Sequence, residues 1–353
     1  MKNRITIALL TCTLAFSFHH ANSQSDMSAF LMAEKSDASK LIGAYVSPVI
    51  KGVSYGMTSG WYHTGKTHNK LGIDFGVTIS AVMMPSSEQT FDPTKLGLSG
   101  ATTPNQNLSP TIIGPKTAAP SNSYDVSYTN GPVSVNQTIN GPDGLDFKKN
   151  LGGNWIPVPM IQLGIGLIKN TDLKVRFIPN QNKDSKSGGN GVGMLGFGLL
   201  HDVKQYFPGV KSLPFDLSVL LAYTSVNGSS SLVNTDQSND GRPYSDNGKV
   251  SYKLNSWVFQ AIISKKVSVL TFYMGVGYGT VNSKVSITGS FALDPYATNG
   301  AYPLVDPFST TYSNKSMKLT TGMRLKLGPI YFNGDYTVQK YSALTVGFGA
   351  SIR

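Results

Sequence analysis

The run LGIDFGVTISAVMM, residues 71–84, alternates between two kinds of side chain. Its odd-numbered positions, from Leu71 to Met83, are all apolar, while the even-numbered positions from Gly72 to Ser80 are small or polar. Because successive side chains of a strand point to opposite faces, this run predicts one strand with an apolar face and a small-polar face. At about fourteen residues, it is much longer than the usual strand of about five or six. Long strands of this kind are typical of a membrane barrel, whose outside meets lipid and whose inside meets water.

The same alternation recurs along the chain, so ten strands are expected. They lie at residues 71–84, 158–168, 172–178, 192–200, 214–226, 249–264, 267–280, 315–327, 329–340 and 342–352. The connections alternate in length: short or medium ones at 169–171, 201–214, 265–266 and near Gly328, and long ones at 85–157, 179–191, 227–248 and 281–314. Only the tight turn near Tyr341 departs from this rule. Short turns on one side and long loops on the other are the arrangement of outer-membrane barrels.

The predicted fold is therefore all-β: an antiparallel transmembrane β-barrel of about 10–14 strands, with an N-terminal helical segment as plug or cap. The alternative is a secreted β-sandwich, which also has many alternating strands. Sandwich strands are usually shorter, and their outward faces carry charge. Here only 14% of residues are charged, against roughly 25% in soluble domains. The mean hydropathy of −0.10 is too low for a helical membrane protein.

The N-terminus has the features of an export signal. Lys2 and Arg4 precede an apolar stretch from Ile5 to Phe18, and Ala21-Asn22-Ser23 forms a small-x-small cleavage site. The expected domains are a signal peptide at 1–23, an N-terminal helical plug or periplasmic segment at 24–60, and the barrel at 61–353. Apolar residues at helical spacing predict a helix over 26–57, with a kink or break at Pro48.

Three blocks of sequence carry a family resemblance. They are KLIGAYVSPVIKGVSYGMTSGWYHTGKTHNKLGIDFGVTISAVMMP, PMIQLGIGLIKNTDLKVRFIP and GFGLLHDVKQYFPGVKSLPFDLSVLLAYT. In this order they resemble an uncharacterised family of outer-membrane β-barrel proteins of Bacteroidetes. More distantly, the layout is similar to the long-chain fatty acid transporter type, in which an N-terminal segment plugs the barrel. The resemblance implies a Gram-negative outer membrane, but no substrate-binding motif of those transporters can be matched here.

Four polar side chains occur on the non-apolar face of predicted strands: Asp74, Gln162, Lys174 and Arg176. A charge facing lipid near the bilayer midplane costs roughly 2–4 kcal/mol, so these side chains should face the lumen. There they either line a pathway or bind the N-terminal helix as a plug.

The stretch GWYHTGKTHNK, residues 60–70, joins the predicted plug to the first strand. Trp61 and Tyr62 are expected as anchors at the periplasmic membrane boundary. Lys66, His63 and His68 are expected around a polar turn. The two histidines are five residues apart, a spacing that suits neither one helix face nor one strand face, so no metal site is expected.

No cofactor and no enzymatic activity are expected. The only cysteine, Cys12, lies in the predicted signal peptide, which excludes disulfides and thiol catalysis from the mature chain. The sequence contains no Gly-x-Ser-x-Gly motif that could supply a nucleophilic serine for His201 to activate. The basic residues form no run typical of nucleic-acid binding.

The predicted function is passage of a small, possibly hydrophobic, solute across the outer membrane, with the N-terminal segment as gate. The alternative is a non-transporting scaffold or adhesion barrel that acts through its extracellular loops. The expected partners are outer-membrane lipid, the solute and the barrel assembly machinery.

Overall fold

The computed structural model describes residues 28–116, 122–130, 133–178, 191–232, 245, 247–291 and 304–352. The predicted signal peptide, residues 1–23, lies outside the described residues.

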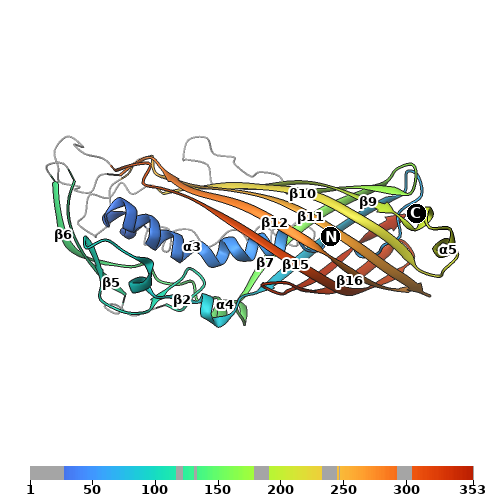
Figure 1. The fold of residues 1–353 in the computed structure, drawn as a ribbon, viewed down its shortest axis with the longest axis horizontal. Coiled ribbons are helices and arrows are strands. Elements are labelled where there is room, and N and C mark those ends of the chain that lie inside the picture. Colours follow the sequence, from blue (N-terminus) through green and yellow to red (C-terminus); the bar gives the residue numbers. More distant parts are fainter. Residues whose placement is uncertain are drawn as a thin grey trace, which may run out of the picture.

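Ten strands form a closed antiparallel barrel (Figure 1). They are β1 (Ile73–Met83), β7 (Trp155–Gly166), β8 (Thr171–Ile178), β9 (Gly191–Asp202), β10 (Asp216–Ser231), β11 (Lys249–Val267), β12 (Leu270–Thr288), β15 (Phe308–Leu327), β16 (Ile330–Val338) and β17 (Ala343–Ile352). Each strand pairs with the next barrel strand in sequence, and β1 closes the barrel by pairing with both β17 and β7. Every predicted strand corresponds to one barrel strand, so the predicted fold class is confirmed.

The outward face of the barrel carries an exposed apolar belt. On β12, for example, Phe272, Met274, Val276 and Tyr278 point outward and are each 43–53% exposed. Other members of the belt are Ile73, Phe75, Ile79, Leu163, Phe177, Leu195, Phe197, Leu199, Leu221, Trp257, Phe259, Ile263, Leu319, Met323, Phe332, Tyr336, Leu344, Val346 and Phe348. An apolar surface this continuous around a closed barrel is the surface that lipid covers. The barrel therefore spans a membrane.

Four strands extend far beyond the belt at the end where the long connections lie. Figure 1 shows β10, β11, β12 and β15 reaching past the other strands. Beyond Trp257 and Tyr278 the outward positions of β11 and β12 turn polar, while the strands continue to Lys249 and Thr288. The strand boundaries expected at 226, 280 and 315 were therefore wrong, because β10 continues to Ser231, β12 continues to Thr288 and β15 begins at Phe308. The period of two persists there, but its apolar face now points inward. Residues 179–190, 233–244 and 292–303 of the predicted loops lie outside the described residues.

The N-terminal segment forms η1 (Ser28–Met32) and one continuous helix, α3 (Lys35–Met57). Of the kink or break expected at Pro48, the break does not occur, because α3 is helical through this residue. Proline in a helix removes one backbone hydrogen bond, but Pro48 is buried and α3 is packed along its length against β1, β7 and β15. Tertiary packing therefore outweighs the local cost. None of the described helices has the length and apolar character needed to cross a membrane.

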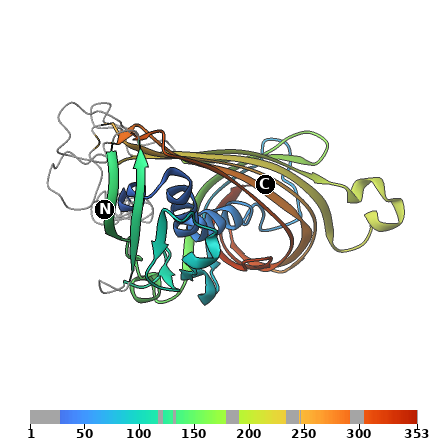
Figure 2. The same cartoon turned by 60° about the vertical axis from the view of Figure 1, so that its left-hand side comes forward.

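The predicted loop 85–157 is largely folded, and together with η1, α3 and the extended strand ends it makes a lobe that we call the outer lobe (Figure 2). Its elements are η2 (Ser86–Glu88), β2 (Thr90–Phe91), η3 (Pro93–Leu96), β3 (Thr102–Pro104), β4 (Ser109–Pro110), β5 (Ser123–Asn130), β6 (Val133–Asn140) and α4 (Phe147–Leu151). The remaining described elements are β13 (Ser290–Phe291) and β14 (Leu304–Val305) at the same end, and η4 (Lys204–Tyr206) and α5 (Pro208–Lys211) between β9 and β10.

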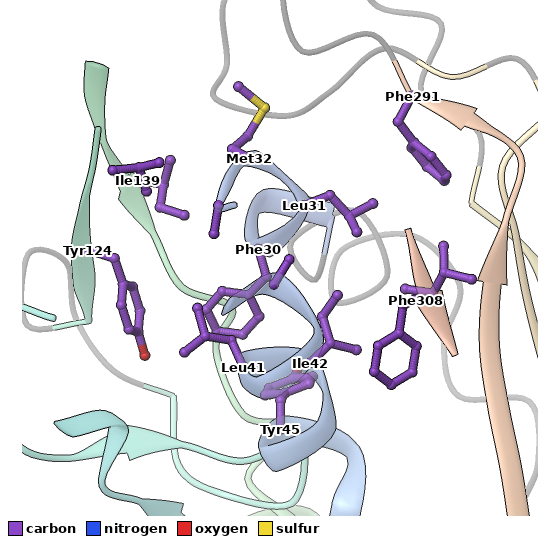
Figure 3. Close-up of a cluster of buried hydrophobic side chains, with 14 of the residues drawn as sticks. Phe30, Leu31, Met32, Leu41, Ile42, Tyr45, Tyr124, Ile139, Phe291 and Phe308 are labelled. Carbon is purple, nitrogen blue, oxygen red and sulfur yellow. The ribbon is translucent and has the colours of Figure 1, made fainter. Parts of the chain in front are cut away.

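Helix α3 is the centre of the outer lobe's core. Figure 3 shows Phe30, Leu41 and Tyr45 between Tyr124 of β5 on one side and Phe308 of β15 on the other. Leu41 and Tyr45 are fully buried, and the Phe30 and Tyr124 rings meet edge to face at 5.5 Å. This core fixes the helix between the small sheets and the extended strands.

The helix lies at the opposite end of the barrel from the one expected. Its Gly43 approaches Tyr312 and its Gly52 approaches Ile156, both at the long-connection end of their strands. The short turns, the start of β1 and the end of β17 lie at the other end (Figure 1). An even number of strands predicts that the N-terminal helix and the end of β17 lie at the same end of the barrel, and that prediction was wrong. The chain passes from one end of the barrel to the other before β1 begins.

Candidate functional site

Residues 58–72 run through the barrel lumen, and we call them the lumen segment. Thr58 meets Lys318 and Gly279 near the outer lobe, Tyr62 meets Gly275 farther along, and Gly65 meets Ser264 near the short turns. At the far end, the Leu71 N–H donates to Gly166 O. These wall contacts follow one another in the same order as the residues of the segment. The segment therefore runs along the lumen from the outer lobe to the short-turn end.

Two cations of the barrel wall bind the carboxyl end of α3. Arg176 donates to the carbonyl oxygens of Met57, at 3.1 Å, and Ser59, at 2.8 Å. Lys318 Nζ donates to the carbonyl oxygen of Thr58, at 2.5 Å, and to its hydroxyl. The last carbonyls of a helix lack partners within the helix and carry partial negative charge, so buried cations are suited to this position. These bonds fasten the helix end to the wall.

The aromatic rings of the lumen segment fit over glycines of the wall. Trp61 is fully buried between the Arg176 guanidinium, 3.8 Å from the ring centroid, and Gly198, where an added Cβ would lie 2.9 Å from the ring. Tyr62 is 3% exposed, and its hydroxyl lies where a Cβ of Gly275 would be. The prediction that these aromatics anchor the membrane boundary was wrong. They fill the lumen instead.

Two histidines of the lumen segment pair with aspartates of the wall. The His63 Nε2 atom is 3.3 Å from Asp74, which also accepts a bond from the Tyr331 hydroxyl. His68 contacts Asp172 twice: its backbone N–H donates to Oδ1 and its Nδ1 is 2.8 Å from Oδ2. These pairs fasten the segment near the short-turn end, as the arginine and lysine do near the outer lobe.

Ser351, His68 and Asp172 form a row in the Ser-His-Asp order of a hydrolase catalytic triad. The His68 Nε2 atom is 3.1 Å from the Ser351 hydroxyl, while its Nδ1 faces Asp172. That arrangement would let a histidine activate a serine. However, all three side chains are at most 2% exposed, so no acyl substrate reaches the serine in this closed state. We interpret the row as an anchor of the lumen segment.

The lumen wall has two chemically different sides. Strands β9, β10, β11 and β12 contribute Leu200, Leu220, Ala222, Val258, Ile262 and Tyr273, which pack with Trp61 and Tyr62 in one apolar cluster. The facing strands carry buried charges: Asp74, Asp172, Lys174, Arg176, Lys318, Arg324 and Asp335. These seven groups are four cations and three anions, so their formal net charge is +1. In the described part of the chain, no three His, Cys, Asp or Glu side chains are grouped to hold a metal.

The predicted site residues come together, although not all as expected. Asp74, Gln162, Lys174 and Arg176 all face the lumen and are buried, and Gln162 bonds both the Trp61 carbonyl and Arg176. Within the segment 61–68, only Lys66 is exposed. This segment lies within the lumen between α3 and β1, and its role as the joint between plug and barrel stays a prediction.

Sequence reasoning missed Lys318, Arg324, Asp335, Asp172 and Ser351. All five occupy inward positions of predicted strands, so the same alternation that identified Lys174 could have found them.

At the rim of the barrel, polar contacts join α3 to η2 and to the turn before β17. Lys51 Nζ lies 2.9 Å from the Glu88 carboxylate, and the Tyr341 hydroxyl donates to the same group. Burial, and next the neighbouring carboxylate, raise the pKa of Tyr341 above its usual range, so the phenol keeps the proton that it donates.

The chain matches a family of unknown function (DUF6588) over residues 1–352, and it belongs to that family. No curated protein matches the sequence. Among solved structures, the chain is similar to Ail, the attachment invasion locus protein of Yersinia pestis, crystallised with the heparin analogue sucrose octasulfate. That match has 7% identity and a TM-score of 0.26, and covers 80% of this chain and 99% of the other. It is also similar to the CymD monoaromatic hydrocarbon channel, with 9% identity, a TM-score of 0.18, and 80% and 89% coverage. Identity and TM-score are low in both cases, and neither likeness assigns a function to this chain.

Proposed function

We propose that this DUF6588 protein is a gated outer-membrane barrel that passes a small solute when the lumen segment leaves its place. One observation carries the proposal: the lumen is filled by a separate segment of chain and not by the barrel's own side chains. Narrow barrels that serve only as membrane anchors fill their interior from the wall. Here the wall has glycines under the aromatic rings, at Gly198 and Gly275 among others, which leaves space once the rings move.

The two sides of the lumen indicate the class of solute. Without the segment, one side of the passage would be the apolar surface of β9 to β12, and the other would carry an excess of one positive charge from the seven groups named above. Arg176 and Lys318 would also lose the helix carbonyls that they bind. A buried cation without a partner is costly, so an anionic group would replace those carbonyls. The solute is therefore amphipathic, with an apolar body and one anionic end.

An outer-membrane location is supported by the same architecture, in which short turns lie at one end of a closed barrel and long connections at the other. On this orientation the outer lobe faces the cell exterior and the short turns face the periplasm. Lipid covers the apolar belt, and the barrel assembly machinery inserts the chain.

A cysteine lock tests the gate. Thr64 of the lumen segment and Ser264 of the wall have side-chain oxygens 3.5 Å apart, so Thr64→Cys with Ser264→Cys can form a disulfide in a Cys12→Ser background. Single-channel conductance is measured in planar bilayers before and after reduction. The oxidised lock is expected to show no openings, and reduction is expected to restore the openings of the unlocked protein.

The control pair crosses the wall without touching the segment. Ser225 and Asn255 are directly opposed on the outward face of β10 and β11, with the Ser225 hydroxyl 3.0 Å from Asn255 Oδ1. Ser225→Cys with Asn255→Cys should open equally in both redox states. Openings that persist with a fully formed 64–264 disulfide, or no openings in any form, contradict the gate.

The outer lobe favours a second function, that of a scaffold or adhesion barrel. Helix α3 is buried in the lobe's core, which holds the small sheets rigidly beyond the membrane. If this is the function, the protein with the 64–264 disulfide should still bind a surface partner on intact cells as well as the reduced protein does. Loss of that binding on locking would exclude it.

A further inference from the structure

The extended ends of β11, β12 and β15 carry a basic outward face just beyond the apolar belt. We call it the lysine face. Its outward positions hold Lys249, Lys253, Lys284 and Lys315, with Ser251, Asn255, Thr280, Asn282, Ser286, Ser309, Thr311 and Ser313 between them. These positions include no aspartate or glutamate, and none of the described ion pairs involves these four lysines.

Two of the lysines are direct cross-strand partners. Lys253 of β11 pairs with Lys284 of β12, and both side chains are exposed on the same face. Directly opposed side chains in an antiparallel pair have Cβ atoms about 4.5–5.5 Å apart, and like charges in that relation repel. An anion between them would remove the repulsion and accept bonds from both ammonium groups.

The lysine face stands at the depth of lipid headgroups. Trp257 and Tyr278 are the last outward aromatics of the belt on β11 and β12, a position typical of the membrane interface. Lys253 lies two outward positions beyond Trp257, and Lys284 lies three beyond Tyr278. With a rise of about 3.3 Å per residue and a tilt of about 45°, both lie roughly 9–14 Å beyond the belt. Lys315 is the first outward position beyond Met317.

From this geometry we propose that the lysine face binds the phosphate groups of lipopolysaccharide, the glycolipid of the outer leaflet. The proposal rests on the outer-membrane orientation proposed above, and it is independent of gating. Lysine clusters beside a membrane bind anionic headgroups, and the serine, threonine and asparagine side chains between them suit the sugar hydroxyls of a glycolipid. Bound glycolipid would hold the extended strands upright against the membrane.

The experiment uses the full-length protein in detergent and measures binding of purified lipopolysaccharide, of the same material after dephosphorylation, and of phosphatidylglycerol micelles. The variant is Lys253→Gln with Lys284→Gln. The control, Lys265→Gln with Lys266→Gln, removes two exposed lysines from the opposite end of the same strand. A heat-dependent gel shift verifies that each barrel is folded.

The wild type and the control are expected to bind phosphorylated lipopolysaccharide equally, and the 253/284 variant at least about 10-fold more weakly. Dephosphorylated material should bind as weakly as the variant does. Equal binding by the 253/284 variant and the control overturns the proposal, and so does binding of phosphatidylglycerol as tight as that of lipopolysaccharide. Since conductance is not measured here, a barrel that never opens can still pass this test. If the proposed outer-membrane location is wrong, the protein will be absent from outer-membrane fractions, and that result is separate from the binding measurement.

Discussion

Glycines of the lumen wall determine where the aromatic rings of the lumen segment lie. A Cβ at Gly275 would lie 2.0 Å from the Tyr62 hydroxyl, whereas a Cβ at Gly334 would meet nothing closer than 3.9 Å. Gly275→Ala should therefore displace Tyr62 and lower the free energy of unfolding by about 1–3 kcal/mol. Gly334→Ala should stay within about 0.5 kcal/mol of the wild type. Denaturant unfolding in detergent measures both, and equal stability of the two variants contradicts the packing described here.

The row of Ser351, His68 and Asp172 allows a second test at the scale of single residues. As an anchor it should not react with acylating reagents, because the serine is 1% exposed. A fluorophosphonate probe is expected to leave the folded protein unlabelled. Labelling that disappears in Ser351→Ala would show instead that the row is a reactive triad.

Single residues also show how far sequence reasoning reached. Alternation placed Asp74, Lys174 and Arg176 on the lumen side, because lipid excludes charge from the other face. It could not place Trp61, since an aromatic residue next to a membrane strand fits an interface as well as a packed lumen. Only the distant partners Arg176 and Gly198 distinguish the two positions, and they lie more than a hundred residues away along the chain.

At the scale of elements, the carboxyl end of α3 depends on the wall cations. Arg176→Gln removes the donor for the carbonyls of Met57 and Ser59 and leaves them buried. The free energy of unfolding should fall by about 2–4 kcal/mol, since each buried acceptor without a partner costs about 1–3 kcal/mol. Channel openings should become more frequent because the segment is less firmly held.

Lys70→Gln is the matched control, because Lys70 is an exposed cation of the lumen segment itself. It should change neither stability nor openings. An Arg176→Gln protein as stable and as closed as the wild type would contradict the role of Arg176 in fastening α3.

The elements themselves were largely predictable, and the exceptions have one physical cause. Strands were recognised by their contrast between an apolar and a polar face, so β12 was expected to stop near Tyr278, where its outward face turns polar. Likewise, helical spacing identified α3, but a helix ahead of the first strand can enter a barrel from either end. Its packing against β5 and β15, far away in sequence, decides the end.

At the scale of the whole molecule, the N-terminal segment passes through the barrel from the outer lobe to the short-turn end. Lys35, at the start of α3, and Lys70, at the end of the lumen segment, are both exposed and lie on opposite sides of the membrane. A cysteine at either position, in the Cys12→Ser background, would be the only thiol of the chain.

Labelling of intact cells with a membrane-impermeant maleimide measures this directly. We expect Lys35→Cys to be labelled in intact cells, and Lys70→Cys to be labelled only after the outer membrane is permeabilised. Labelling of both positions in intact cells, or of both only after permeabilisation, would place them on the same side and contradict a segment that crosses the lumen.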